Sequence, residues 1–235
     1  MKKVCLVLAV VMLGFVSIVS AQKPFAGVIK MHRHIEGTDD PNLLSQGDRE
    51  YSVTVFGNYT KTVTSQEGVG GSTTITNGDA KTVLTIIEIV GMGKYYLEVP
   101  AEKFQERDKT TKYEYNKTGE KMTIANYECE KVLVTVTDLE TDESDNIVVY
   151  VSKDINNSDA INYMEFPGLA GYPLRTEVKV DADGTEITLV DEAVEVIPNK
   201  KIKIVDFMMP SDAQDIHTNP QMMKMLGLGG DDDEE

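Results

Sequence analysis

The sequence contains a series of short segments in which apolar and polar residues alternate, and this feature constrains the fold most strongly. Such a period of about two residues is typical of β-strands. Asp-Gly, Asn-Gly and Gly-x-Gly turns separate many segments, and such short connections indicate an antiparallel meander rather than parallel βαβ units. The chain is therefore expected to be mainly β, with strands at Gly27–Ile35, Glu50–Phe56, Tyr59–Thr64, Thr82–Val90, Lys94–Val99, Thr111–Tyr115, Lys121–Ile124, Lys131–Thr137, Asn146–Ser152, Leu174–Val180, Glu186–Ile197 and Lys201–Phe207.

Several of these expected strands are apolar on both faces. Thr82–Val90, Lys131–Thr137 and Asn146–Ser152 carry apolar side chains at odd as well as even positions. A sheet with one solvated face would instead alternate between apolar and polar residues. A second layer has to cover these strands, and it could be a second sheet, a helix or a bound apolar ligand.

Helical signals are scarce and gather near the C-terminus. Ser211 and Gln214 fit a capping box, and Asn219 with Pro220 fits the start of a second helix that ends near Gly227. Helices this short need tertiary contacts to form. Residues 211–226 are therefore expected to dock as a short helical cover on the apolar mouth of the sheet.

Three other segments have compositions that predict little regular structure. Residues 159–165 suggest a turn or two of helix, and the Gly/Ser/Thr-rich residues 65–81 suggest a flexible loop. The terminal residues 227–235 end in five adjacent acids, which repel each other and bury nothing, so a disordered acidic tail is expected.

The N-terminus has the pattern of a secretory signal. Two lysines precede an apolar run from Val4 to Val19, and small residues lead to Ala21. We expect a signal peptide at residues 1–21, a single β-rich domain at residues 22–210, and export to the periplasm or the exterior of a Gram-negative bacterium. A retained membrane anchor is the alternative, but the run is shorter than the ~20 residues of a spanning helix. No later segment is long and apolar enough, so no stable membrane span is expected after cleavage.

Charge and cysteine content exclude several classes of protein. The net charge of −16 disfavours nucleic acid and anionic lipid surfaces as partners. Cys129 is the one cysteine beyond the signal, so packing has to stabilise the domain without an internal disulfide. Its neighbours Glu128 and Glu130 disfavour a thiolate, and no histidine motif surrounds it. Cys129 is therefore interpreted as a buried packing residue.

No residue pattern identifies an enzyme, a cofactor or a metal site. His32 and His34 share a strand face, but no third ligand is marked, so an exposed strand is the favoured interpretation. Asp181–Glu186 and Asp138–Asn146 are acidic and are interpreted as hairpin loops, because they lack the full ligand pattern of a calcium loop. The sequence therefore predicts a non-catalytic protein.

The methionine-rich C-terminal segment offers one candidate ligand contact. Thioethers suit copper(I), but Met222, Met225 and Leu226 have the spacing of one helix face, which favours apolar packing. Methionine also adapts to irregular surfaces. These three residues are the candidate cover over an apolar ligand.

Four stretches between about Lys81 and Pro210 resemble a bacterial exported family of unknown function, domain of unknown function 4412. The stretches are KTGEKMTIANYECEKVLVTV, VVYVSKDI, GYPLRTEVKV and IVDFMMPSD. The resemblance implies a fold similar to the LolA/LolB lipoprotein carriers. That fold is a strongly curved antiparallel sheet, an open half-barrel with a few short helices covering its concave side over an apolar cavity.

Two functions of different classes remain open. The first is an envelope protein that binds or carries an apolar ligand such as a lipid or an acyl chain. The alternative is a structural or interaction module that contacts other envelope proteins and has no small-molecule ligand. A carrier needs a cavity of roughly 300–1,000 Å³, whereas a module needs none.

Overall fold

The computed structural model describes residues 25–66, 70–182 and 184–228. The expected signal peptide lies outside these residues, as does the acidic end of the expected tail. The described chain forms one sheet of twelve strands. They are β1 (Ala26–Glu36), β2 (Arg49–Phe56), β3 (Tyr59–Gln66), β4 (Gly70–Asn77), β5 (Thr82–Ile89), β6 (Gly93–Val99), β7 (Thr111–Ile124), β8 (Tyr127–Asp138), β9 (Ser144–Ser152), β10 (Tyr172–Ala182), β11 (Thr185–Pro198) and β12 (Ala213–Asp215).

The strand order is β12-β6-β5-β4-β3-β2-β1-β11-β10-β9-β8-β7. The strands from β1 to β6 form a meander in one direction, and those from β7 to β11 form a second meander that returns to β1. All pairs are antiparallel except β12 with β6. The expected mainly β, antiparallel class is therefore confirmed.

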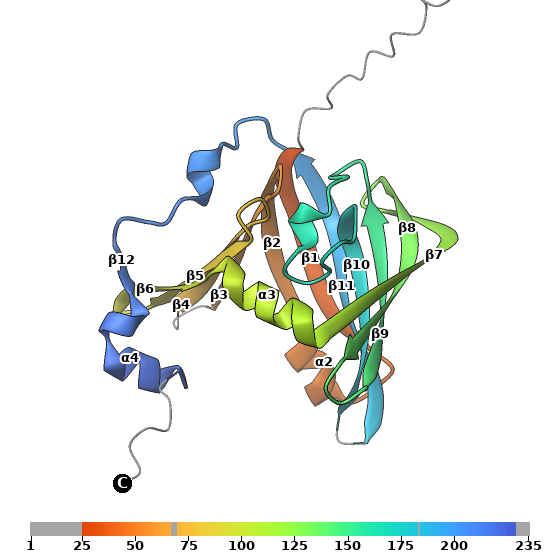
Figure 1. The fold of residues 1–235 in the computed structure, drawn as a ribbon, viewed down its shortest axis with the longest axis horizontal. Helices are drawn as coiled ribbons and strands as arrows, with labels where there is room; N and C mark the ends of the chain where they lie inside the picture. The colour runs from red at the N-terminus through yellow and green to blue at the C-terminus, as the bar shows by residue number, and fades with distance from the viewer. Residues whose placement is uncertain (1–24, 67–69, 183, 229–235) are drawn as a thin grey trace, which may run out of the picture.

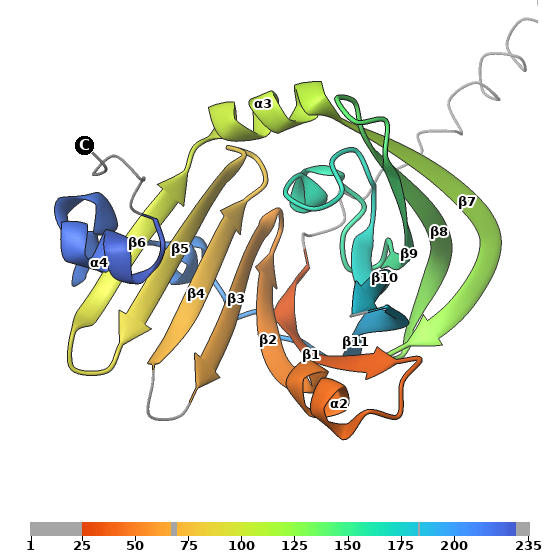
Figure 2. The ribbon, with the colours of Figure 1, turned by 90° about the horizontal axis from the view of Figure 1, so that it is seen from below.

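Helix α3 (Ala101–Thr110) carries the chain from β6 to β7, from one end of the sheet to the other (Figure 1). Figure 2 shows the sheet bending towards one side, with α3 crossing the open side of the bend. Residues 153–171, the inner loop between β9 and β10, lie inside the bend and include the 3-10 helix η1 (Ala160–Asn162) (Figure 2). We call the sheet face on this side the inner face and the opposite face the outer face.

Most expected strands appear within two or three residues of their predicted bounds, and two of them merge into β7. Two expectations were wrong. Lys201–Phe207 was expected to be a strand, but its second half forms the 3-10 helix η2 (Ile204–Phe207). Residues 65–81 were expected to be a flexible loop, but they contain β4, which pairs with β3 and β5 on its two sides. Pairing on both edges outweighs the poor strand propensity of its glycines.

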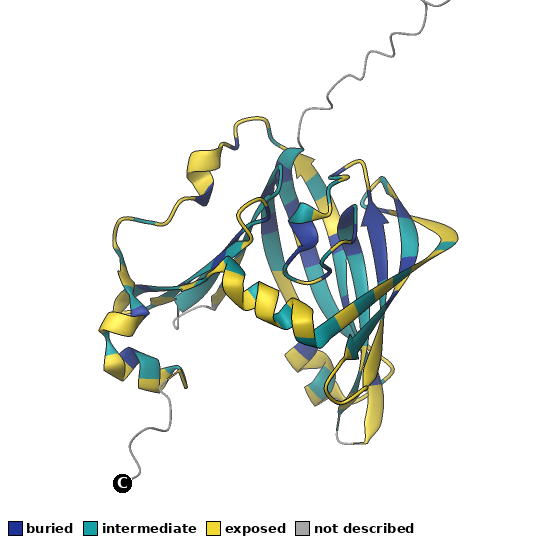
Figure 3. Ribbon diagram, in the orientation of Figure 1, coloured by how far each residue is buried: buried dark blue, intermediate teal, exposed yellow. Residues whose placement is uncertain are grey.

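Both faces of the sheet carry buried apolar clusters, which explains the two-sided apolar strands. Ile29, Val55 and Leu174 are fully buried in the largest cluster, together with residues of the inner loop. Ile75 and Ile86 lie on the outer face of β4 and β5, where they pack against Phe207. Figure 3 shows that buried positions concentrate on the strands around the inner loop, while α3 is mostly exposed.

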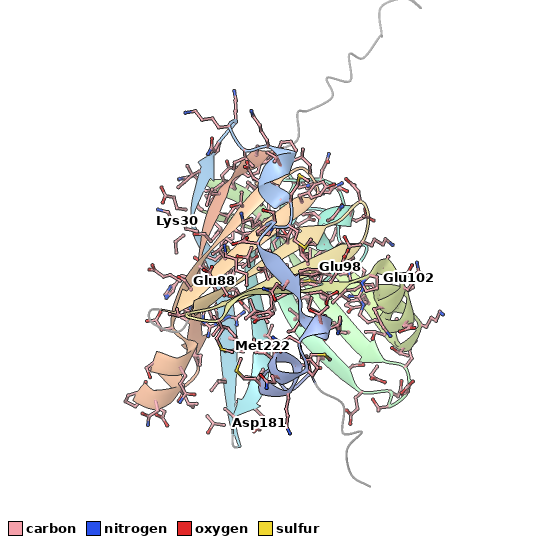
Figure 4. All side chains as sticks on the ribbon, turned by 90° about the vertical axis from the view of Figure 1, so that its left-hand side faces the viewer. Lys30, Glu88, Glu98, Glu102, Asp181 and Met222 are labelled. Carbon is pink, nitrogen blue, oxygen red and sulfur yellow. The ribbon has the colours of Figure 1, made fainter. Side chains whose placement is uncertain are left out.

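The C-terminal segment beyond β11 wraps around one edge of the sheet. It first crosses the outer face, where the Phe207 ring lies 6.3 Å from the Phe56 ring and 5.8 Å from the Tyr59 ring. Figure 4 looks onto this face and shows the segment running across the strands, with Glu88 and Glu98 on either side. The segment then adds β12 to the edge strand β6. The same C-terminal segment therefore covers part of the outer face and this edge of the sheet.

After β12, the 3-10 helix η3 (Ile216–Thr218) and helix α4 (Pro220–Met225) pack on β6. The capping box expected at Ser211 was wrong, because residues 213–215 extend as β12 instead of forming a helix. The second expected helix is confirmed: the Asn219 side chain accepts a hydrogen bond from the Met222 amide at 3.1 Å, and Gly227 follows with a φ of 69°. Helix α2 (Pro41–Gly47) is capped in the same way by Asp40.

No helix within the described ranges has the length and apolar character needed to cross a membrane.

Candidate ligand-binding cavity

A cavity of about 640 Å³ lies between the inner face of the sheet and the inner loop. Strands β1 to β4 form one side of it, and strands β9 to β11 form the other. Residues 161–166 of the inner loop close part of the space between them. The bend of the sheet therefore encloses a volume in the range of small-molecule sites.

One wall of the cavity is a row of hydroxyl groups. In β3 and β4 five of the six threonines point inward, while Thr73, Val63 and Ile75 face outward, so the inner face is polar where that of an ordinary sheet would be apolar. The register places Thr62 opposite Thr74 and Thr60 opposite Thr76, so the hydroxyls form two facing rows. The row comprises Thr60, Thr62, Thr64, Thr74 and Thr76.

The remaining walls are largely apolar. The side chains come from four strands and from the inner loop, and they are Met31, Val53, Ile147, Ile161, Phe166 and Val178. Val53, Ile161 and Phe166 are nearly inaccessible to solvent, so these parts of the wall are fixed by packing. The cavity is thus amphipathic, with one hydroxyl wall and one hydrocarbon wall.

A charged group from three strands borders the cavity. Arg33 on β1 donates two parallel hydrogen bonds to Asp191 on β11, with Nε–Oδ1 at 2.9 Å and Nη2–Oδ2 at 2.7 Å. Tyr51 on β2 donates a further hydrogen bond to Asp191 Oδ1 at 2.8 Å. Burial and the neighbouring Asp191 carboxylate both raise the pKa of Tyr51, so its hydroxyl stays protonated and remains a donor. The bidentate pair therefore neutralises the Arg33 charge at this point of the wall.

Glu165 faces the same cavity from the inner loop. Its side chain is open to the cavity space, but the surrounding protein limits its hydration and raises the pKa of the carboxyl group. Repulsion from Asp191 raises the pKa further, and Arg33 partly offsets both effects. Across the described residues, the Glu165 carboxylate has no side-chain hydrogen bond or ion pair. Its negative charge is therefore not neutralised by an ion pair, unlike that of Asp191.

Three sets of hydrogen bonds hold the inner loop in place. The Asn162 amide donates to the Leu169 and Gly171 carbonyls at 2.7 and 2.5 Å. Tyr115 of β7 donates to the Pro167 carbonyl at 2.9 Å. The loop that carries Glu165 is therefore held from both of its ends.

Arg107 of α3 adds the third set by donating to the carbonyls of Tyr163 and Met164 at 3.0 and 2.6 Å. The Phe104 ring of the same helix contacts the Tyr163 ring edge-on at 5.0 Å. The carbonyls that accept from Arg107 immediately precede Glu165 in the chain. The crossover helix thus fixes the part of the loop that presents the carboxylate.

The sequence-predicted cover residues lie away from this cavity. Met222 is 1% exposed and packs with Tyr95 and Ile216 at the β6 end of the sheet. Leu226 is partly buried in the same cluster, whereas Met225 is 53% exposed. None of the three cover residues borders the cavity, and their role as a ligand cover stays a prediction.

The other residues weighed from the sequence occupy structural positions. Cys129 is fully buried, and burial raises the pKa of its thiol to about 11, which agrees with a packing role. His32 and His34 lie on the outer face and contact different carboxylates, those of Asp48 at 2.7 Å and Glu36 at 3.2 Å. In the described ranges, no group of three or more His, Cys, Asp or Glu is arranged to hold a metal ion.

The two acidic segments form turns. Gly184 has a φ of 85°, and its amide donates to the Asp181 carboxylate at 2.7 Å, while Asp183 lies outside the described residues. Asp138 accepts hydrogen bonds from the amides of Glu140 and Thr141, which lower the pKa of its carboxyl group. Both segments connect neighbouring antiparallel strands, as expected for hairpin loops.

Sequence reasoning missed the residues that form the cavity. Arg33, Tyr51, Glu165 and Asp191 come from four separate segments, and no spacing connects them. A detectable signal was the alternation of threonine with valine or isoleucine in TKTVT and STTIT, which marks two strands with one polar face.

No protein-family model and no curated protein matches the sequence. The resemblance to the exported family therefore stays a prediction. Among solved structures, one described as a structure of PNGF-II aligns with a TM-score of 0.53 and 16% sequence identity. The alignment covers 85% of this chain but 33% of that chain, so this chain spans about a third of the length of that protein. At this identity the similarity concerns the fold alone.

Proposed function

We propose that this protein is a non-catalytic binding or carrier protein of the cell envelope, and that it holds an apolar chain such as an acyl chain in the inner-face cavity. The observation that carries the proposal is the cavity of about 640 Å³ with apolar side chains from four strands and the inner loop. Burial of each methylene group of a ligand on that wall contributes roughly 0.8 kcal/mol.

We also propose that the fold of this protein is an open half-barrel similar to that of the LolA/LolB lipoprotein carriers. The bend of the sheet, the crossover by α3 and the inner loop support this part, because together they enclose space on one side of the sheet (Figure 2). The hydroxyl wall formed by the β3 and β4 threonines departs from a wholly apolar cavity. We therefore extend the ligand class from apolar to amphipathic molecules.

The test is calorimetric titration with decanol, a neutral molecule with one apolar chain. Thr62→Trp places a large side chain inside the cavity and is expected to weaken decanol binding at least tenfold. Val63→Trp is the matched control, because the neighbouring residue faces outward and is 42% exposed. Its decanol affinity is expected to equal that of the wild type.

Extraction of lipids from protein purified from its native envelope complements the titration. Mass spectrometry is expected to detect a bound amphipathic molecule in stoichiometric amount. If decanol does not bind and no molecule co-purifies, the carrier function is wrong and the interaction module, which needs no ligand, replaces it.

A further inference from the structure

The Glu165 carboxylate is placed at the cavity in a way that a purely structural role does not explain. The side chain contributes no hydrogen bond or ion pair to the fold across the described residues. The side chain is exposed to the cavity space, where limited hydration and the neighbouring Asp191 raise the pKa of its carboxyl group. A carboxyl group that borders a cavity, has no hydrogen-bond partner in the fold and has a raised pKa is a candidate for ligand contact.

The nearby positive charge does not satisfy Glu165. The Arg33 guanidinium forms its two short bonds with Asp191, and Tyr51 donates to the same carboxylate. Arg49, the Cα partner of Arg33 on β2, also borders the cavity, but no ion pair joins it to Glu165 within the described residues. The pair of Arg33 and Asp191 is neutral as a unit, so the Glu165 carboxylate remains uncompensated.

The backbone that carries Glu165 is also held firmly. The Arg107 bonds to the Tyr163 and Met164 carbonyls fix the backbone directly before Glu165, and the Asn162 bonds fix the turn that follows. A carboxylate carried on a held backbone segment beside a hydrocarbon wall presents a charged anchor and an apolar surface to the same molecule. Pre-organisation of this kind reduces the entropy lost on binding.

We propose that the cavity binds an amphipathic molecule with a cationic head group, whose ammonium or similar group pairs with the Glu165 carboxylate while its chain lies on the apolar wall. This inference rests on the proposed function and names the class of its ligand. The net charge of −16 also favours the approach of a cation. Within the cavity, a charge-assisted hydrogen bond between ammonium and carboxylate is stronger than a neutral one.

The experiment compares decylamine, decanol, decanoate and butylamine by calorimetric titration at mildly alkaline pH, where Glu165 is more fully ionised. Decylamine is expected to bind at least tenfold more tightly than decanol, and decanoate more weakly than decanol. Butylamine has the same head group without the long chain and is expected to bind at least tenfold more weakly than decylamine.

Glu165→Gln is expected to reduce the affinity for decylamine at least tenfold, to about that for decanol, and to leave decanol binding unchanged. Glu98→Gln is the matched control, because Glu98 is exposed on the outer face of β6 (Figure 4). It is expected to bind decylamine as the wild type does. Circular dichroism and thermal unfolding establish that both variants are folded, and unchanged decanol binding by the Glu165→Gln variant establishes that the apolar wall is intact.

Each of three results would overturn the inference. They are tighter binding of decanoate than of decylamine, unchanged decylamine binding by Glu165→Gln, and binding of butylamine as tight as that of decylamine. If any of these results is obtained while decanol still binds, the preference for a cationic head group is wrong, but the proposed function is not contradicted. Failure of all four compounds to bind the wild-type protein removes the inference, and if no molecule co-purifies with the protein it removes the proposed function as well.

Discussion

At the scale of single residues, Glu165 and Asp191 show how one environment gives two carboxylates different roles. Asp191 accepts four hydrogen bonds from Arg33 and Tyr51, which satisfy its oxygens. Glu165 borders the same cavity with an exposed side chain but receives none of these donors. Asp191 therefore stabilises the contact between β1 and β11, whereas Glu165 is left available for a ligand.

The raised pKa of Glu165 predicts a pH-dependent stability. The folded protein binds this proton more tightly than the unfolded chain, whose carboxyl has a pKa near the ordinary value of 4.5. Stability is therefore lost as the pH rises from about that value through the raised folded pKa. Glu165→Gln removes the ionisable group and is expected to be more stable than the wild type above this window, with the difference disappearing at lower pH.

Urea unfolding of Glu165→Gln and of the wild type over a range of pH measures this difference. The charged and titratable groups around Glu165 are Asp191, Arg33 and Tyr172, together with Arg49 and Tyr51 of the same cavity, and none of them is changed by the substitution. Glu98→Gln on the outer face is expected to show no such pH-dependent gain. Equal stability differences at low and high pH would contradict the assigned pKa.

At the scale of elements, strands with a clear alternation of apolar and polar residues could be predicted from sequence, but covering segments could not. β1, β2 and β9 have this alternation or a continuous apolar run bounded by turns. In β4 the alternation is confined to the short stretch STTIT, whose inner threonines border the cavity, and the adjacent glycines resemble a loop. Lys201–Phe207 alternates like a strand, but it crosses the outer face and only Ile202 and Phe207 are buried.

The C-terminal elements form a cover on one edge, and Met222 is the residue that attaches α4. Its side chain is 1% exposed among Tyr95 and Ile216, so Met222→Ala leaves a cavity and costs roughly 2–5 kcal/mol locally. Amides of residues 220–226 are expected to exchange faster with solvent deuterium in this variant. Met225→Ala is the control, because that side chain is 53% exposed and its loss is expected to cost under about 0.5 kcal/mol.

At the scale of the whole molecule, two meanders meet at β1 and β11, and one helix joins their far ends. This connectivity bends the sheet around the inner loop and places residues from distant segments around one cavity (Figures 1 and 2). The mainly β class could be predicted from local alternation alone. The cavity could not, because its charged residues become neighbours only through the pairing of β1 with β2 and β11.

Entry of an apolar chain into the inner-face cavity can be measured directly by fluorescence, because the sequence contains no tryptophan. Phe166→Trp introduces one indole into the cavity wall, and Tyr96→Trp introduces one on the outer face as the control. Each variant is titrated with decanol that carries a terminal bromine, which quenches indole fluorescence on contact. We predict saturable quenching in the Phe166→Trp variant and none in the Tyr96→Trp variant. Equal quenching of both indoles, or none in the Phe166→Trp variant, would contradict it.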